Sequence, residues 1–126
     1  MARVHYPGLA THPQHELAGS QMSGFGGVLG IELAGGFEAA DVFLGRLRYA
    51  RRSASLGGVD SLAVHPASMW RGMLSEDQIA ASGVPLGLVR LAAGTEDTPD
   101  LVADVLAAAD ALVSDSPENL GEELIP

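Results

Sequence analysis

The apolar residues of this chain gather in two short runs, residues 26–33 ("GGVLGIEL") and 87–93 ("GLVRLAA"), and these runs limit what the chain can fold into. Each run has the length of a β-strand and contains β-branched residues, and neither is long enough to cross a membrane. We therefore expect two strands here and a third, shorter strand over residues 4–6, closed by Pro7 and Gly8. The chain is expected to fold around a small sheet.

Four helices are expected between and after these strands. The clearest spans residues 37–50, where apolar side chains recur every three or four positions and form one buried face. A second spans residues 75–81 and begins with Ser75 as its N-cap and acidic residues in its first turn. The remaining two cover residues 12–21, with Thr11 as the cap and Pro13 in the first turn, and residues 95–113, with Asp97 or Thr98 as the cap.

Residues 53–69 ("SASLGGVDSLAVHPASM") break into short extended pieces around glycines and a proline, so we expect a turn-rich segment of the kind that often carries sites. The order of elements predicts an α+β fold of two layers, with helices on one face of a small sheet. We expect one domain over residues 1–114, followed by an acidic, mobile tail over residues 115–126.

Composition excludes several classes of function. The 126 residues carry a formal net charge of -9, which argues against a nucleic-acid surface. There is no cysteine, which excludes disulfides, thiol nucleophiles and thiolate zinc sites. All seven cationic residues are arginines, so no lysine is present to form a Schiff base. No secretory signal or membrane span is evident, and we expect a soluble, cytoplasmic protein.

Arg90 stands in the middle of the second apolar run. An unpaired guanidinium inside a protein is costly, so this side chain needs a carboxylate or phosphate partner, or access to water. The residues alone leave three possibilities open, which are pairing with Glu96 or Asp97, exposure at a sheet edge, and binding of an anionic ligand.

Other patterns are weaker. His12 and His15 could meet on one helix face, but two histidines without a third ligand do not predict a metal site. The glycine pairs in "GFGG" and "LAGG" lack the spacing of a dinucleotide-binding loop and are interpreted as turns.

Three motifs together resemble the C-terminal domain of the transsulfuration enzymes. They are "YPGLATHPQHELAGSQMSGFGGVLGIEL", "SASLGGVDSLAVHPASM" and "GLVRLAAGTED", and the resemblance runs from about Val4 to about Leu112. The family comprises the pyridoxal-phosphate-dependent cystathionine γ-synthases, cystathionine γ- and β-lyases and methionine γ-lyases. It implies the small domain of a fold-type I enzyme, packed beside a larger domain that carries the cofactor lysine.

The resemblance also implies roles for particular residues. Arg90 occupies the position of the arginine that binds the α-carboxylate of the amino-acid substrate, a contact that suits the planar guanidinium. Asp60 stands where the family usually has glutamate, near the distal end of the substrate or the cofactor lysine. Ser61 would lie close to that lysine and to the substrate carboxylate, and Leu62 would offer its backbone N–H. A polar β-turn facing water is the alternative for these last three residues.

The chain departs from the family after Met69, where Trp70 and Arg71 replace the threonine and histidine of many relatives. Trp70 is a candidate for a substrate entrance, a subunit contact or the core, and Ser55 is a second candidate for the entrance.

The function expected from the resemblance is that of the substrate-binding domain of a C–S lyase or γ-synthase acting on cystathionine, methionine or a homoserine ester. Without a lysine the chain would not be catalytic alone, so it would be a fragment or one half of a split enzyme. Its expected partners are a lysine-bearing, pyridoxal-phosphate-binding domain and further copies of itself, with no nucleic acid, membrane or metal. The alternative is an interaction module that keeps the fold without catalysis and binds through an exposed apolar face.

Overall fold

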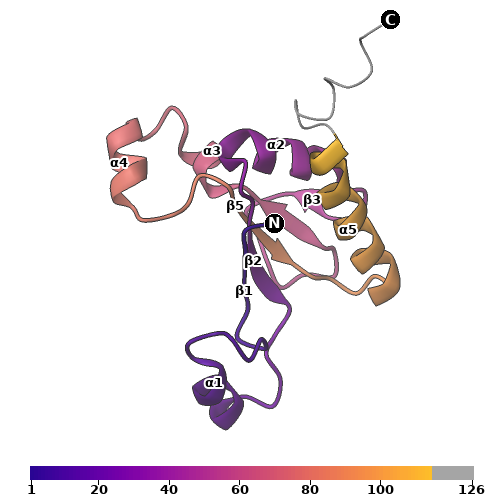
Figure 1. Ribbon diagram of the computed structural model, residues 1–126. Coiled ribbons are helices and arrows are strands. Elements are labelled where there is room, and N and C mark those ends of the chain that lie inside the picture. The colour runs from indigo at the N-terminus through magenta and orange to yellow at the C-terminus, as the bar shows by residue number, and fades with distance from the viewer. Residues whose placement is uncertain (115–126) are drawn as a thin grey trace, which may run out of the picture.

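The computed structural model describes residues 1–114 and contains one five-stranded sheet with five helices (Figure 1). The strands are β1 Arg3–His5, β2 Val28–Glu32, β3 Arg51–Arg52, β4 Leu62–Val64 and β5 Leu88–Ala92. The helices are α1 His15–Gln21, α2 Gly36–Arg46, α3 Pro66–Trp70, α4 Glu76–Ala81 and α5 Thr98–Ser114. This arrangement confirms the α+β class.

The strands lie in the order β1-β2-β5-β4-β3, so the second apolar run of the sequence forms the central strand. β5 is antiparallel to both of its neighbours, β2 and β4, and β3 is parallel to β4. Arg90 therefore stands in the middle of the sheet, opposite Gly30 on β2 and Val64 on β4.

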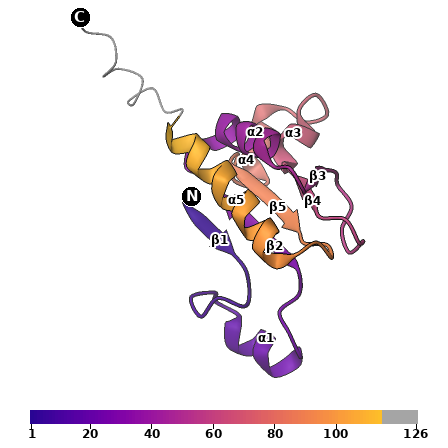
Figure 2. The same ribbon diagram turned by 90° about the vertical axis from the view of Figure 1, so that its right-hand side faces the viewer.

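Helices α2 and α5 cover one face of the sheet (Figure 2). Their apolar side chains pack against the inward residues of the strands, and Phe43 of α2 is fully buried between them. The core residues of this face are Ile31, Leu33, Ala40, Phe43, Leu44, Ala50, Ala63, Val89, Leu91 and Ala108. Burial of this apolar area is the main stabilising contribution to the fold.

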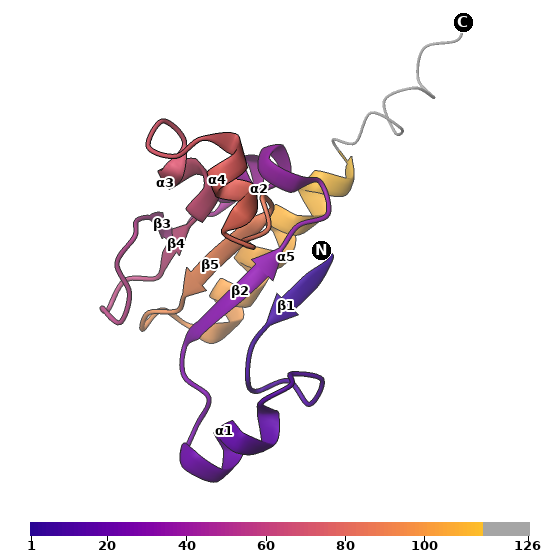
Figure 3. The same cartoon turned by 90° about the vertical axis from the view of Figure 1, so that its left-hand side faces the viewer.

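The opposite face of the sheet, which we call the open face, has no helix of the α2 and α5 layer over it (Figure 3). Successive side chains of a strand point to opposite faces, so Val89 and Leu91 point into the core whereas Leu88 and Arg90 lie on the open face. Gly30, directly opposite Arg90, adds no side chain beside the guanidinium stem.

Helix α2 is shorter than the 37–50 helix predicted from periodicity, because it ends at Arg46. The backbone N–H groups of Arg48 and Tyr49, which would continue the helix, donate instead to the carboxylate of Asp104 on α5. The prediction followed the apolar spacing as far as Leu47 and could not detect this distant acceptor.

Thr11 was the wrong N-cap for the first helix. Residues 6–15 make a series of turns, with His12 N–H donating to Leu9 O and His15 N–H to His12 O, and α1 begins only at His15. By contrast, Ser75 caps α4 as predicted, in a capping box with Gln78. α1 lies beyond one end of β1 and β2, away from the core (Figures 1 and 3).

The turn-rich segment contains more regular structure than predicted. It supplies β4 and most of α3, and β3 precedes it at two arginines that gave no strand signal. Residues 115–126, predicted to be a mobile tail, lie outside the described residues. Within residues 1–114, no helix combines the length and apolar character needed to cross a bilayer.

Candidate functional site

Arg90 meets no carboxylate in the part of the chain that the structure describes. Its Nη2 donates to the backbone carbonyls of Ala54 and Ser55, at 2.6 and 2.9 Å. Its Nε is buried and has no hydrogen-bond partner among residues 1–114. The alternative of an ion pair with Glu96 or Asp97 is therefore wrong, and the guanidinium keeps part of its hydrogen-bonding capacity unused.

Ser61 lies in the interior just before β4, with no exposed surface. Its hydroxyl donates to Glu96 Oε2 at 2.7 Å and accepts from the Gly94 N–H at 2.8 Å, and its own N–H donates to Glu96 Oε1 at 2.8 Å. Both donors of Ser61 are thus held by one carboxylate. A direct bond from this hydroxyl to a lysine or a substrate would require the segment around it to open.

The hydrogen bonds from Ser61 have an electrostatic consequence for Glu96. They favour the charged carboxylate, the backbone N–H more than the hydroxyl, and so lower the pKa of Glu96 below its usual range. From the sequence, Glu96 was predicted only as one possible ion-pair partner of Arg90. No local pattern could have paired it with Ser61, which lies 35 residues away.

Asp60 and Leu62 flank Ser61 and differ in exposure. The Asp60 carboxylate is exposed and stands 3.9 Å from the exposed guanidinium of Arg51, a distance that gives little stabilisation. Leu62 is half-buried and begins β4, opposite Ala92 of β5. The chain therefore passes from the surface at Asp60 to the interior at Ser61 and enters the sheet at Leu62.

Ser55 and Trp70 lie in different places. Ser55 is exposed in the loop between β3 and β4, and its carbonyl is one of the two that hold Arg90. Trp70 is half-buried at the end of α3, so it and Ser61 lie at opposite ends of β4. The neighbouring Arg71 places its guanidinium 4.3 Å from the centroid of the Phe37 ring, which accounts for an arginine at this position by packing.

The histidines of the first motif have structural contacts. His15 Nδ1 lies 2.8 Å from the Pro7 carbonyl and its ring stacks on Phe25, while His12 Nδ1 accepts from the Gln14 N–H. Among residues 1–114, no three histidine, aspartate or glutamate side chains come close enough together to hold a metal ion.

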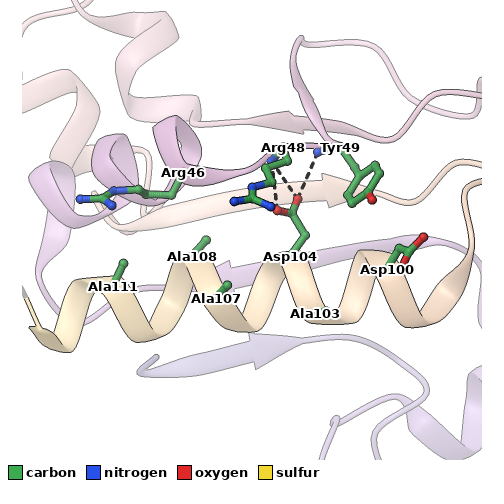
Figure 4. Close-up of a pocket in the computed structure, with 9 residues that line it drawn as sticks. All are labelled: Arg46, Arg48, Tyr49, Asp100, Ala103, Asp104, Ala107, Ala108 and Ala111. Carbon is green, nitrogen blue, oxygen red and sulfur yellow. Dashed lines mark hydrogen bonds between the residues drawn. The ribbon is translucent and has the colours of Figure 1, made fainter.

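A separate hollow of about 450 Å³ lies between α5 and the segment that follows α2 (Figure 4). Asp104 lies in its wall, and both of its carboxylate oxygens accept backbone N–H groups at 2.9 to 3.1 Å. Its bonds tie α5 to the end of α2, which is a structural role. The sequence held a signal for it, because Asp104 shares the apolar face of α5 with Leu101 and Ala108.

Comparison with known proteins gives one consistent family. The family model described as "Cys/Met metabolism PLP-dependent enzyme" matches residues 1–110. An L-methionine gamma-lyase from Fusobacterium nucleatum subsp. polymorphum is 45% identical over 103 residues, which are 82% of this chain and 26% of that protein. An O-succinylhomoserine sulfhydrylase from Pseudomonas aeruginosa is 42% identical over 110 residues, 87% of this chain and 27% of that protein.

A solved structure agrees with these relatives. The cystathionine gamma synthase of Xanthomonas oryzae pv. oryzae, in complex with cystathionine, superposes with a TM-score of 0.78 at 44% identity and covers 89% of this chain and 29% of that one. The 126 residues therefore span about a quarter of the length of the curated relatives they match.

Proposed function

Because the chain belongs to the family of PLP-dependent enzymes of cysteine and methionine metabolism, we propose that it supplies the domain that binds the α-carboxylate of the amino-acid substrate, with Arg90 as the ligand of that carboxylate. One observation carries the proposal. Arg90 stands on the central strand, on the open face, and its buried Nε has no hydrogen-bond partner within the residues that the structure describes. A guanidinium held rigidly with unused donors is well suited to bind a carboxylate.

The names of the relatives support a site for the common part of several substrates. L-Methionine, O-succinylhomoserine and cystathionine share an α-amino acid group and differ at the distal end of the side chain. A residue that serves all three must recognise the shared group. Asp60 is exposed and lies in the same loop as the two carbonyls that bind Arg90, and we assign its carboxylate to the variable distal end of the substrate. We assign the backbone N–H of Leu62 to the shared α-amino acid end.

Pyridoxal phosphate does not fit these residues alone. The cofactor of this family needs a lysine amine for its covalent attachment, and the 126 residues contain none. We therefore propose that the lysine and the cofactor belong to a larger domain outside these residues, which packs on the open face. The chain's own contribution is to bind and orient the substrate, and orientation of a reacting bond is worth several kcal/mol.

Native mass spectrometry of the protein from its source tests the need for a partner. A complex that carries a lysine-bearing polypeptide with bound pyridoxal phosphate, or a longer chain that contains both parts, supports the proposal. Self-association of the 126 residues without any lysine-bearing region would favour an interaction module instead. Further copies of the chain in the complex would support the expected homo-oligomer.

The role of Arg90 is tested in that complete enzyme with Arg90→Ala. Removal of one member of a desolvated charge pair costs about 2–5 kcal/mol, so kcat/KM for the amino-acid substrate should fall about 30-fold or more, mainly through KM. Arg52→Ala is the matched control, because Arg52 lies on the edge strand β3 and pairs with Asp41 of α2. Equal kinetics for Arg90→Ala and Arg52→Ala would refute the role.

A further inference from the structure

The loop of residues 53–61, which we call the carbonyl loop, holds the guanidinium of Arg90 through two backbone carbonyls. Its residues 54–60 are all exposed, and Gly57 adopts a φ of 77° that favours glycine, so the loop buries little apolar surface of its own. Segments with few buried apolar contacts open at low cost. The position of Arg90 therefore depends on what fastens this loop.

One end of the carbonyl loop is fastened by Arg90 itself, at Ala54 and Ser55. The other end is fastened to the turn that follows β5. There the Thr95 N–H donates to Val59 O at 2.8 Å, and the Thr95 hydroxyl donates to the same carbonyl at 3.2 Å. The two backbones touch, since a Cβ at Gly94 would come within 2.2 Å of Val59 O, which leaves room for glycine only.

Glu96 provides the strongest part of this attachment. Its two carboxylate oxygens accept the N–H and the hydroxyl of the fully buried Ser61, and bonds to a charged acceptor are stronger than neutral ones. Ser61 in turn accepts from Gly94, so three groups form one closed network. Loss of the carboxylate would leave two buried donors without acceptors.

We propose that Glu96 is a positioning residue, which clamps Ser61 and so fixes the carbonyl loop that holds the Arg90 guanidinium in place for the substrate carboxylate. Its effect on substrate binding rests on the proposed function, whereas its effect on the loop does not. Ser61 then acts through the geometry of the loop rather than by direct contact with the substrate.

The clamp itself is tested in the 126-residue chain by hydrogen exchange of individual amides. In Glu96→Ala, we expect exchange at Ser61 and Gly94 to be at least about tenfold faster, because the bonds that close this network are lost. In Glu96→Gln, the exchange rates should lie between those of the unsubstituted chain and those of Glu96→Ala, since the glutamine amide keeps one acceptor oxygen. Asp97→Asn is the control, because the exposed side chain of Asp97 makes no described hydrogen bond. Unchanged exchange at Ser61 in Glu96→Ala would overturn the clamp.

The consequence for Arg90 is tested by kinetics of the complete enzyme. Glu96→Ala should raise KM for the amino-acid substrate at least about tenfold with a smaller change in kcat, and Glu96→Gln should restore part of the loss. In a double-mutant cycle, the variant with both Ser61→Ala and Glu96→Ala should raise KM little more than either single variant does, because both substitutions remove the same hydrogen-bond network.

The outcomes separate the two proposals. Faster exchange with an unchanged KM would overturn the positioning role, even if Arg90→Ala still raises KM and the proposed function stands. Faster exchange with unchanged KM in both Glu96→Ala and Arg90→Ala would refute the proposed function and leave the clamp as a structural device only.

Discussion

In the layer that covers one face of the sheet, Asp104 is buried and both of its carboxylate oxygens are bound to backbone N–H groups. On the open face, the buried Nε of Arg90 has no hydrogen-bond partner in the described part of the chain. A buried polar group is normally satisfied within the fold that evolved around it. The comparison indicates that the Asp104 carboxylate is satisfied within this chain, whereas the Arg90 guanidinium keeps donors that a further molecule could use.

The largest effect that tests this comparison comes from the core of the covered face. Phe43 has no exposed surface, so Phe43→Ala should lower the free energy of unfolding by about 3–5 kcal/mol, as measured by urea denaturation of the chain. Val42→Ala, at an exposed neighbouring position on α2, should change it by less than about 0.5 kcal/mol. Similar losses in the two variants would contradict a core centred on this face.

The next effect concerns the carboxylate that ends α2. Asp104→Ala leaves the N–H groups of Arg48 and Tyr49 without their acceptor and should cost about 2–3 kcal/mol of unfolding free energy. Asp104→Asn should cost roughly half as much, because one oxygen acceptor remains. Asp100→Asn, on the exposed first turn of α5, should cost less than about 1 kcal/mol. If Asp104→Ala lowers the free energy of unfolding no more than Asp100→Asn does, Asp104 does not support the covered face.

The smallest effect is a dependence of stability on pH at the carbonyl loop. The pKa of Glu96 is lower in the folded chain, so the folded state favours the charged carboxylate. Its contribution to stability is present above the ordinary carboxyl pKa and is lost as the pH falls through the lowered folded value. The difference in unfolding free energy between the chain and Glu96→Gln should therefore shrink from pH 7 to pH 3. A difference that stays constant with pH would contradict a charged Glu96 in the clamp.

The sequence predicted the parts of this molecule that local patterns determine. The central strand with its arginine, the apolar face of α2 and the cap at Ser75 each follow from spacing within a few residues. The early end of α2 and the pairing of Glu96 with Ser61 depend on residues 35 to 56 positions apart, which no local pattern records. β3 was missed for a similar reason, because two exposed arginines form a strand only through pairing with β4.

The candidate site was predicted in part. The side chain of Arg90 on β5 contacts the carbonyl of Ser55, in the loop that also contains Asp60 and Ser61, so the structure connects these four predicted residues through one loop. Their contacts were not predictable, since the partners of Arg90 are backbone carbonyls and those of Ser61 lie beyond β5. The roles of these residues toward a substrate stay predictions.

The most direct test of the central claim compares an amino-acid substrate with its carboxamide in the complete enzyme, each with and without Arg90→Ala. If Arg90 binds the α-carboxylate, the substitution should lower kcat/KM about 30-fold or more for the amino acid but only slightly for the carboxamide, which carries no negative charge for Arg90 to pair with. An equal loss for both substrates would contradict the account, because Arg90 would then act on something other than the carboxylate.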